Sequence, residues 1–147
     1  MKVIIQRVGS ASVCIDKKLI SQIEKGFLIL VGISKDDTQK DIDYISKKIL
    51  NLRIFESDNG YFDKSIQDIN GEILFVSQFT LYADCTKGNR PSFSSAMSPE
   101  QAKIFYKNFL DDFKKLYPKI KDGQFGAKMQ VELVNDGPVS IILDSKK

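Results

Sequence analysis

The stretch Phe27-Leu28-Ile29-Leu30-Val31-Gly32-Ile33 decides the fold of this chain, because it contains no polar side chain. Its length fits a β-strand, and the lack of alternation between polar and apolar positions indicates burial on both faces. The run is also far too short to span a bilayer, which needs about 20 residues. We therefore expect a strand over 27–33 with other parts of the chain packed on both of its faces.

Shorter segments with β character lie on either side of this strand along the chain. The expected strands are 3–8, 11–15, 19–23, 52–55, 73–76, about 129–134 and 139–143. Gly9-Ser10 indicates a bend or bulge between the first two. The sequences at 57–60 and Asn70-Gly71 are typical of turns, and 83–93 is expected to be a long polar loop.

A helical period appears twice. Asp36 or Asp37 is the expected N-cap of the first helix. The second helix is expected to begin with Ser98 as N-cap and Pro99 at the first helical position, and Gln101 would complete a capping box. The expected apolar stripes are Ile42, Ile45, Ile49 and Leu50 in the first helix, and Ala102, Phe105, Tyr106, Phe109, Phe113 and Leu116 in the second, which Pro118 ends. Two helices among more numerous short strands predict a sheet-dominated α/β protein with its helices on one face.

Composition narrows the class further. With 147 residues, 42% of them hydrophobic and 28% charged, the chain matches one soluble globular domain over 1–147. A net charge of +3 does not indicate nucleic-acid binding, although it permits a local basic patch. Cys14 and Cys85 form no C-x-x-C pair, so we expect free thiols and no structural zinc. Residues 1–7 turn polar too early for a secretory signal, which favours a cytoplasmic protein.

The first candidate site is Ser77-Gln78-Phe79-Thr80-Leu81, where an apolar strand changes abruptly to polar residues. Hydroxyl, amide and backbone N–H groups would gather at such a strand end. They could bind a carbonyl oxygen and stabilise negative charge, as an oxyanion hole does. The alternative is a strand that simply leaves the core, with Ser77 and Thr80 satisfying local backbone groups. The pattern alone favours this second interpretation.

The chain has no histidine, so any hydrolysis must draw on the backbone or on the substrate. Thr80 is a candidate nucleophile, but a threonine hydroxyl needs a base beside it, and the sequence places no lysine or carboxylate there. A hydrogen-bonding role suits Thr80 better. Asp36, Asp37 and the pair Asp111-Asp112 fall at helix starts or on an exposed helix face. Capping and solvation explain them without a metal or an acid–base role.

The second candidate site is Asn135-Asp136-Gly137-Pro138-Val139. Asn-Asp-Gly between two apolar runs is typical of a hairpin turn, but Pro138 removes an N–H that the returning strand could use. A cis Gly137-Pro138 bond is one solution, yet only about 5–6% of X–Pro bonds are cis. The residues alone therefore predict a hairpin with a trans bond.

Two cationic segments remain. The loop 87–93 combines Lys87 and Arg90 with a glycine and Phe93, which suits contacts with a single-stranded RNA end, but composition alone favours a solvated surface loop. A second cationic stretch comprises Lys114, Lys115, Lys119 and Lys121. It is explained by an exposed helix face and the segment that follows it.

The motifs taken together resemble the D-aminoacyl-tRNA deacylase family over essentially the whole chain. The strings that carry the resemblance are Gln6-Arg7-Val8, Ala11-Ser12-Val13, 48–55, 77–84, 87–93, Phe125-Gly126-Ala127 with Met129, and 135–139. The resemblance implies a homodimeric hydrolase that needs neither metal nor organic cofactor. Its substrate would be the ester that joins a D-amino acid, or a mischarged glycine, to the adenosine at the 3′ CCA end of tRNA. We expect a mixed α/β fold in three layers, with two helices on two mainly antiparallel, barrel-like sheets.

The resemblance also implies roles for individual residues. Gly137 and Pro138 would form a cis peptide that enters the partner's pocket, holds the substrate's α-amino group with its carbonyl oxygens and leaves no room for an L side chain. Arg7 would pin this element. The other wall would be Ser77, Gln78, Phe79 and Thr80, with the N–H groups near Phe79 and Thr80 facing the scissile carbonyl. Phe125 and Met129 would help to form the adenosine pocket, and the 2′-hydroxyl of that adenosine would activate water.

Two departures from the family pattern are visible. Ser140 replaces a threonine, which keeps the hydroxyl and loses a methyl group. Phe62-Asp63-Lys64-Ser65 replaces a Met-Asn-x-Ser pattern, which affects local packing rather than the reaction. Two other classes of function stay open at this point: a non-catalytic module that binds tRNA ends, and a small-molecule esterase that does not depend on RNA.

Overall fold

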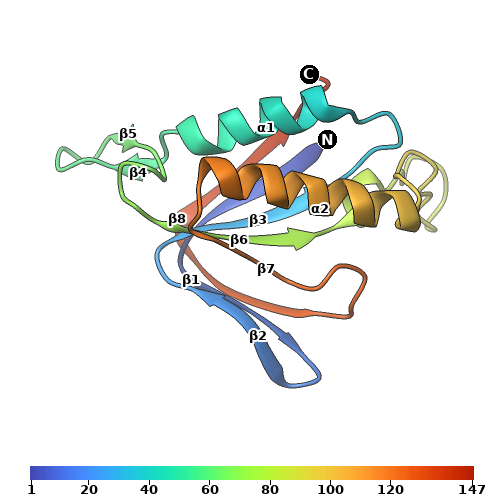
Figure 1. The fold of residues 1–147 in the computed structure, drawn as a ribbon, viewed down its shortest axis with the longest axis horizontal. Helices are drawn as coiled ribbons and strands as arrows, with labels where there is room; N and C mark the ends of the chain where they lie inside the picture. Colours follow the sequence, from blue (N-terminus) through green and yellow to red (C-terminus); the bar gives the residue numbers. More distant parts are fainter.

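A computed structural model describes residues 1–147, with two α-helices and eight strands (Figure 1). In chain order the elements are β1 (Lys2–Ile15), β2 (Lys18–Ile23), β3 (Gly26–Gly32), α1 (Gln39–Asn51), β4 (Phe55–Glu56), β5 (Phe62–Lys64), β6 (Glu72–Ser77), the short 3₁₀ helix η1 (Phe79–Tyr82), α2 (Pro99–Leu116), β7 (Ile120–Asp122) and β8 (Gln130–Asp144). The expected α/β class is confirmed, but the strand expected at 52–55 is wrong except at Phe55, where the two-residue strand β4 begins.

Six strands form one continuous sheet. Its order is β2-β1-β3-β6-β7, with β8 on the other side of β1. The pairs β3–β6 and β6–β7 are parallel and the others antiparallel, while β4 and β5 pair only with each other. The layers that we expected as two sheets are two halves of this sheet, because β1 and β8 run through both. Figure 1 shows α1 and α2 together on one side of it.

Strand β3 is buried on both faces, as its sequence predicts. Phe27, Ile29 and Val31 lie in a core of 21 buried residues that includes the inner faces of both helices. Leu28 points the other way, into a second core of seven buried residues between the two halves of the sheet. Side chains alternate across a strand, so an apolar residue at every position is what two cores require.

The helices bury the expected stripes with one exception. Phe109 and Phe113 of α2 pack edge-on against Phe75 of β6, with ring centroids 5.2 and 5.0 Å apart. Leu116 was expected in this stripe, but its side chain is 60% exposed. The next residue, Tyr117, is buried in its place and donates its hydroxyl to the carbonyl oxygen of Gly71.

The helix caps differ in part from the prediction. Thr38, rather than Asp36 or Asp37, is the N-cap of α1, and its N–H donates to Asp41 at 2.8 Å. Ser98 caps α2 with Pro99 next to it, as predicted. The expected capping box does not form, because the Ser98 hydroxyl donates to the side-chain oxygen of Gln101.

The hairpin expected at 135–138 does not exist. Both flanking segments belong to the single strand β8 and pair antiparallel with β1, so the chain passes Gly137 without reversing. The pairing skips around Arg7, because Gln6 faces Ser140 and Val8 faces Asn135. The Gly137-Pro138 bond is cis, which contradicts the trans bond predicted from the residues and agrees with the resemblance.

A buried charge cluster joins the two ends of the chain to the start of α1. The terminal ammonium of Met1 contacts the Asp37 carboxylate at 2.5 Å and donates a hydrogen bond to the hydroxyl of Ser145 at 2.6 Å. Asp41 accepts hydrogen bonds from Ser145 and Lys146 at 2.6 and 2.9 Å. Burial alone raises the pKa of the Asp41 carboxyl, but bonds from Lys146, Ser145 and Thr38 outweigh it and hold the pKa well below its usual value.

We expect Asp41→Asn to lower the free energy of unfolding by about 2 kcal/mol near neutral pH, because it removes a buried acceptor of charge-assisted hydrogen bonds. The folded-state pKa lies below the unfolded one. The carboxylate therefore stabilises the fold above about pH 4 and loses this effect as the pH falls further, towards the folded-state value. Urea unfolding from neutral to acidic pH measures the difference between parent and variant, which should shrink in acid.

Asp43→Asn is the matched control, because Asp43 is exposed on the same helix and accepts only from Gln39. It should change stability little at any pH. A constant difference between parent and Asp41→Asn across the whole pH range would contradict the assigned role of the carboxylate.

Candidate active site

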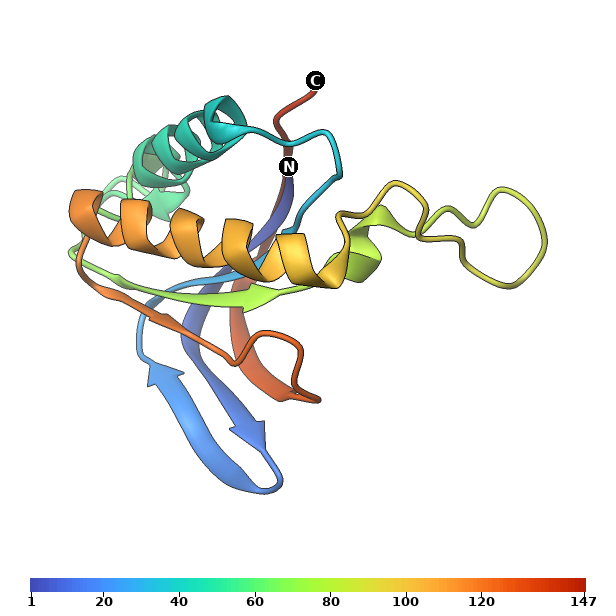
Figure 2. The ribbon, with the colours of Figure 1, turned by 45° about the vertical axis from the view of Figure 1, so that its right-hand side comes forward.

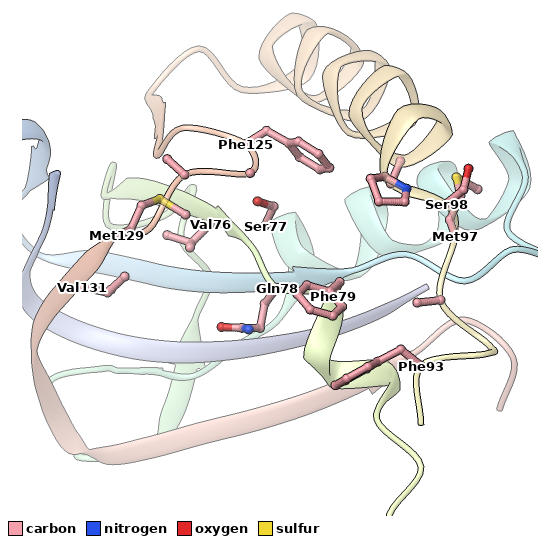
Figure 3. A pocket seen from close by; sticks show the side chains of 15 residues that line it. Val76, Ser77, Gln78, Phe79, Phe93, Met97, Ser98, Phe125, Met129 and Val131 are labelled. Carbon is pink, nitrogen blue, oxygen red and sulfur yellow. The ribbon is translucent and has the colours of Figure 1, made fainter. Parts of the chain in front are cut away.

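An apolar cavity of about 610 Å³ opens beyond the end of β6. It lies between η1, the first turn of α2 and the segment that leads into β8 (Figure 3). Its lining is Val76, Ser77, Gln78, Phe79, Phe93, Ala96, Met97, Ser98, Pro99, Ala102, Phe125, Gly126, Ala127, Met129 and Val131. The volume falls within the usual range of small-ligand pockets.

Ser77, Gln78 and Phe79 line this cavity where the buried strand β6 ends. The N–H of Gln78 still donates to Val31 of β3 at 2.7 Å, so the backbone is fixed up to this residue. Gly32 permits the close approach, because a Cβ there would lie 2.9 Å from Cβ of Leu81 and 3.2 Å from the carbonyl oxygen of Gln78. The sheet thus positions the polar end of β6 rigidly.

Thr80 lies at the edge of the site and its side chain does not line the cavity. Its hydroxyl accepts a hydrogen bond from the amide of Gln78, an interaction that orients the residue without activating it. Phe79 and Thr80 begin η1, where backbone N–H groups have no acceptor within the helix. Phe79 lines the cavity and Thr80 follows it in the chain, so two backbone donors without an acceptor in the helix adjoin the lining in sequence.

Phe125 and Met129 line the opposite wall, and Figure 3 shows both beside Ser77. The Phe125 ring packs against Tyr106 of α2 with centroids 5.7 Å apart. Met129 fits over Gly123, where an added Cβ would come within 2.6 Å of its sulfur atom. The sequence-predicted pocket residues are thus brought together from two distant parts of the chain.

Arg7, Gly137 and Pro138 lie elsewhere, and none of them lines the cavity of its own chain. Arg7 is buried in the bend of the sheet, where Nε donates to the carbonyl oxygen of Asp136 at 2.8 Å. Gly137 has a φ of +137° and is exposed with Pro138 on β8. Asn135 fixes the segment by accepting from the N–H of Val139 at 2.8 Å.

The sequence departure at Ser140 is accommodated within this segment. Its hydroxyl lies 3.1 Å from the side-chain nitrogen of Asn135, which donates to it. A serine therefore supplies the oxygen that this contact needs.

No ionisable side chain lines the cavity. Behind the wall, Tyr106 packs against Phe125; burial and the charge of Asp122 raise the pKa of Tyr106, and burial raises that of Asp122. The protein also has no group of three His, Cys, Asp or Glu side chains able to hold a metal ion. The polar groups that this chain offers in the lining are therefore backbone groups, hydroxyls and an amide.

The sequence did not reveal the wall formed by Phe93, Met97 and the start of α2. The ring of Phe93 lies 4.9 Å from that of Phe79 and closes one side of the opening. Ser98-Pro99 predicted a helix start, but only the fold shows that this start faces β6. Lys87 and Arg90 are exposed in the loop before it, which Figure 2 shows extending away from the body of the protein.

The second cationic stretch is mostly paired rather than free. Lys115 contacts Asp112 at 2.8 Å, and Lys121 contacts Glu72 at 3.2 Å. Lys119 donates to the carbonyl oxygen of Asn70. These contacts agree with the simpler interpretation of this stretch as a solvated surface.

The fold and cavity define an α/β protein with a polar strand end beside an apolar pocket that has no ionisable lining. Comparison with known proteins identifies its relatives. A model of the D-Tyr-tRNA(Tyr) deacylase family matches residues 4–144. The chain therefore belongs to this family.

Curated relatives extend over the whole chain. D-aminoacyl-tRNA deacylases of Clostridium novyi (strain NT) and Thermosipho africanus (strain TCF52B) are 53% and 52% identical, and each match covers 100% of this chain and 99% of the relative. A solved structure described as a c-Myc DNA unwinding element binding protein is 50% identical, with a TM-score of 0.94 over 98% of each chain. A probable eukaryotic D-amino acid tRNA deacylase shares the fold, with a TM-score of 0.85 and 14% identity over 97% of each chain.

Proposed function

We propose that this protein hydrolyses the ester between a D-amino acid, or a mischarged glycine, and the adenosine at the 3′ CCA end of tRNA. Family membership supports a hydrolase that acts on D-aminoacyl-tRNA. The observation that carries the mechanism is the cavity without ionisable lining. Such a site suits an ester, which needs stabilisation of a developing oxyanion more than it needs a protein nucleophile.

In this mechanism the protein binds and polarises the ester. The N–H groups of Phe79 and Thr80 face the scissile carbonyl, while Ser77 and Gln78 complete that wall. Phe125 and Met129 hold the adenosine in the apolar part of the cavity. The 2′-hydroxyl of the adenosine assists the attacking water, because the lining has no side chain that is a general base at neutral pH.

Chirality is judged by a second copy of the chain. Five residues of extended strand lie between Val131, which lines the cavity, and Gly137, and these six residue steps span about 20 Å. Gly137-Pro138 is thus remote from its own pocket and enters the pocket of the partner, where its carbonyl oxygens hold the α-amino group. An L side chain then meets the backbone of this pair.

The edge of the sheet supports such a homodimer. β8 pairs only with β1, so 15 residues of strand present a free edge. Val134 and Ile142 on this strand are 62% and 72% exposed. Long free edges with apolar residues are normally covered, and a second copy covers this one without leaving Gly137-Pro138 in solvent.

The site of action follows from the substrate. No helix of the protein is long and apolar enough to cross a membrane. Aminoacylated tRNA is used at the ribosome, and we propose that the protein acts in the cytoplasm.

Incubation of purified protein with D-tyrosyl-tRNA tests the proposed function directly. We expect release of free D-tyrosine, little hydrolysis of L-tyrosyl-tRNA, and at least a hundredfold slower release when the terminal 2′-hydroxyl is removed. A module that only binds tRNA ends would protect the ester. An esterase driven by its own side chains would hydrolyse the 2′-deoxy substrate at an almost unchanged rate.

Thr80→Ala should retain measurable turnover, with a rate constant reduced about tenfold, because the variant loses one orienting hydrogen bond but no nucleophile. Single-turnover hydrolysis of D-tyrosyl-tRNA measures this. A complete loss of activity in a protein with parental unfolding behaviour would instead indicate covalent catalysis by the hydroxyl.

Mixing two inactive variants tests the contribution of the partner. Ala127→Trp fills the cavity, and Gly137→Val places a side chain against Val139 and Arg7. If Gly137 acts across the dimer, co-refolded variants form mixed dimers with one intact site, which restores about a quarter of parental activity. If Gly137 served its own chain, mixing would restore nothing; the size of each variant in solution is the control.

A further inference from the structure

The guanidinium of Arg7 contacts several residues in addition to Asp136. Besides the bond to Asp136, its guanidinium donates to the carbonyl oxygen of Ile54 at 2.7 Å. Glu56 lies 3.5 Å from it, and its central carbon lies 5.4 Å from the ring centroid of Phe62. The guanidinium therefore joins the Gly137 segment to the β4–β5 ribbon.

The ribbon has a fixed base and an exposed outer part. Phe55 of β4 is buried and stacks on Phe27, with centroids 5.0 Å apart. Glu56 pairs with Phe62 across the ribbon, so the two residues that contact the guanidinium lie opposite each other. Phe62 is 53% exposed and its neighbour Tyr61 is 75% exposed. Of these two aromatic rings, that of Phe62 contacts the guanidinium of Arg7.

The ring of Phe62 can strengthen the hydrogen bonds of the guanidinium. The face of an aromatic ring attracts a guanidinium and keeps water away from it. Hydrogen bonds from a charged donor to carbonyl oxygens gain strength when water is excluded. Arg7 is only 5% exposed, and its guanidinium lies over the ring of Phe62, which is itself half-exposed. The bond to Asp136 is therefore stiffened by a residue that never touches it.

We propose that Phe62 is a positioning residue for Gly137-Pro138, and that it acts through Arg7. The ring fixes the guanidinium, and the guanidinium fixes the carbonyl oxygen of Asp136. The orientation of Gly137 and Pro138, which follow Asp136 in the chain, is thereby set. This inference rests on the proposed function, in which Gly137-Pro138 distinguishes D from L substrates. Loosening the guanidinium then affects selectivity more than the rate on the preferred substrate.

The test compares rate constants for D-tyrosyl-tRNA and L-tyrosyl-tRNA under single turnover. We expect Phe62→Ala to lower the ratio of the two constants about three- to fivefold, the effect of losing one partly exposed contact between a cation and a ring. Phe62→Tyr keeps the ring and should restore the parental ratio. Tyr61→Ala removes a comparable ring from the same ribbon and should leave the ratio unchanged.

A double variant distinguishes action through Arg7 from a general effect on the ribbon. In an Arg7→Lys background, which already lowers the ratio, Phe62→Ala should add nothing. The proposal is overturned if the two effects multiply, if the ratio for Phe62→Ala equals that of the parent, or if both rate constants fall equally. A parent protein that hydrolyses neither substrate would overturn the proposed function as well, whereas an active parent with an unmoved ratio would overturn the role of Phe62 alone.

Discussion

The pairing of β8 with β1 over nearly its whole length is the constraint on which the rest of the structure depends. β8 begins beside the cavity at Val131, passes Gly137 and ends at the charge cluster around Asp41. One strand therefore connects the pocket wall, the exposed Gly137-Pro138 pair and the chain terminus. Since a paired strand is extended and stiff, the distance between pocket and pair is set by the sheet and cannot close within one copy.

In the proposed mechanism, a cavity without ionisable groups divides the work of hydrolysis between protein and substrate. The protein contributes geometry: the strand end at Ser77, donors at the start of η1 and an apolar surface for the base. The substrate contributes the 2′-hydroxyl next to the attacking water. If hydrolysis proceeds in this way, the activity depends on the RNA part of the substrate, and other esters that lack a correctly placed 2′-hydroxyl are spared.

Much of the fold could be predicted from local patterns. The apolar run of β3, the stripes of α1 and α2 and the polar exit of β6 each depend on the period of side chains along one element, and the structure confirms them. The caps of α1 were assigned wrongly because Asp37 is recruited by the ammonium of Met1, a contact between residues far apart in the sequence. Leu116 was placed in the core because it continues the stripe, but α2 ends at this residue and Tyr117, in extended backbone, is buried in its place.

The candidate site was predicted less evenly. Ser77 and Gln78 follow from the abrupt end of an apolar strand, but the wall at Phe93 and Met97 depends on where α2 crosses β6, which no local pattern contains. Local rules failed most clearly at Gly137-Pro138. The sequence from Asn135 is typical of a hairpin turn, but both flanking segments pair with β1 and not with each other. Only the likeness of several motifs to one family pointed to the cis bond.

If the backbone of Gly137-Pro138 selects the substrate, as we propose, the structure explains where this chain tolerates change. The positions of the two carbonyl oxygens then depend on the contacts of Arg7 and Asn135. Ser140 can then lose a methyl group, because its hydroxyl alone meets Asn135. The ribbon can likewise carry Phe62 in place of another apolar residue, provided that some group covers the guanidinium. When main-chain atoms select the substrate, substitutions are restricted at the residues that hold those atoms in place and tolerated at the residues around them.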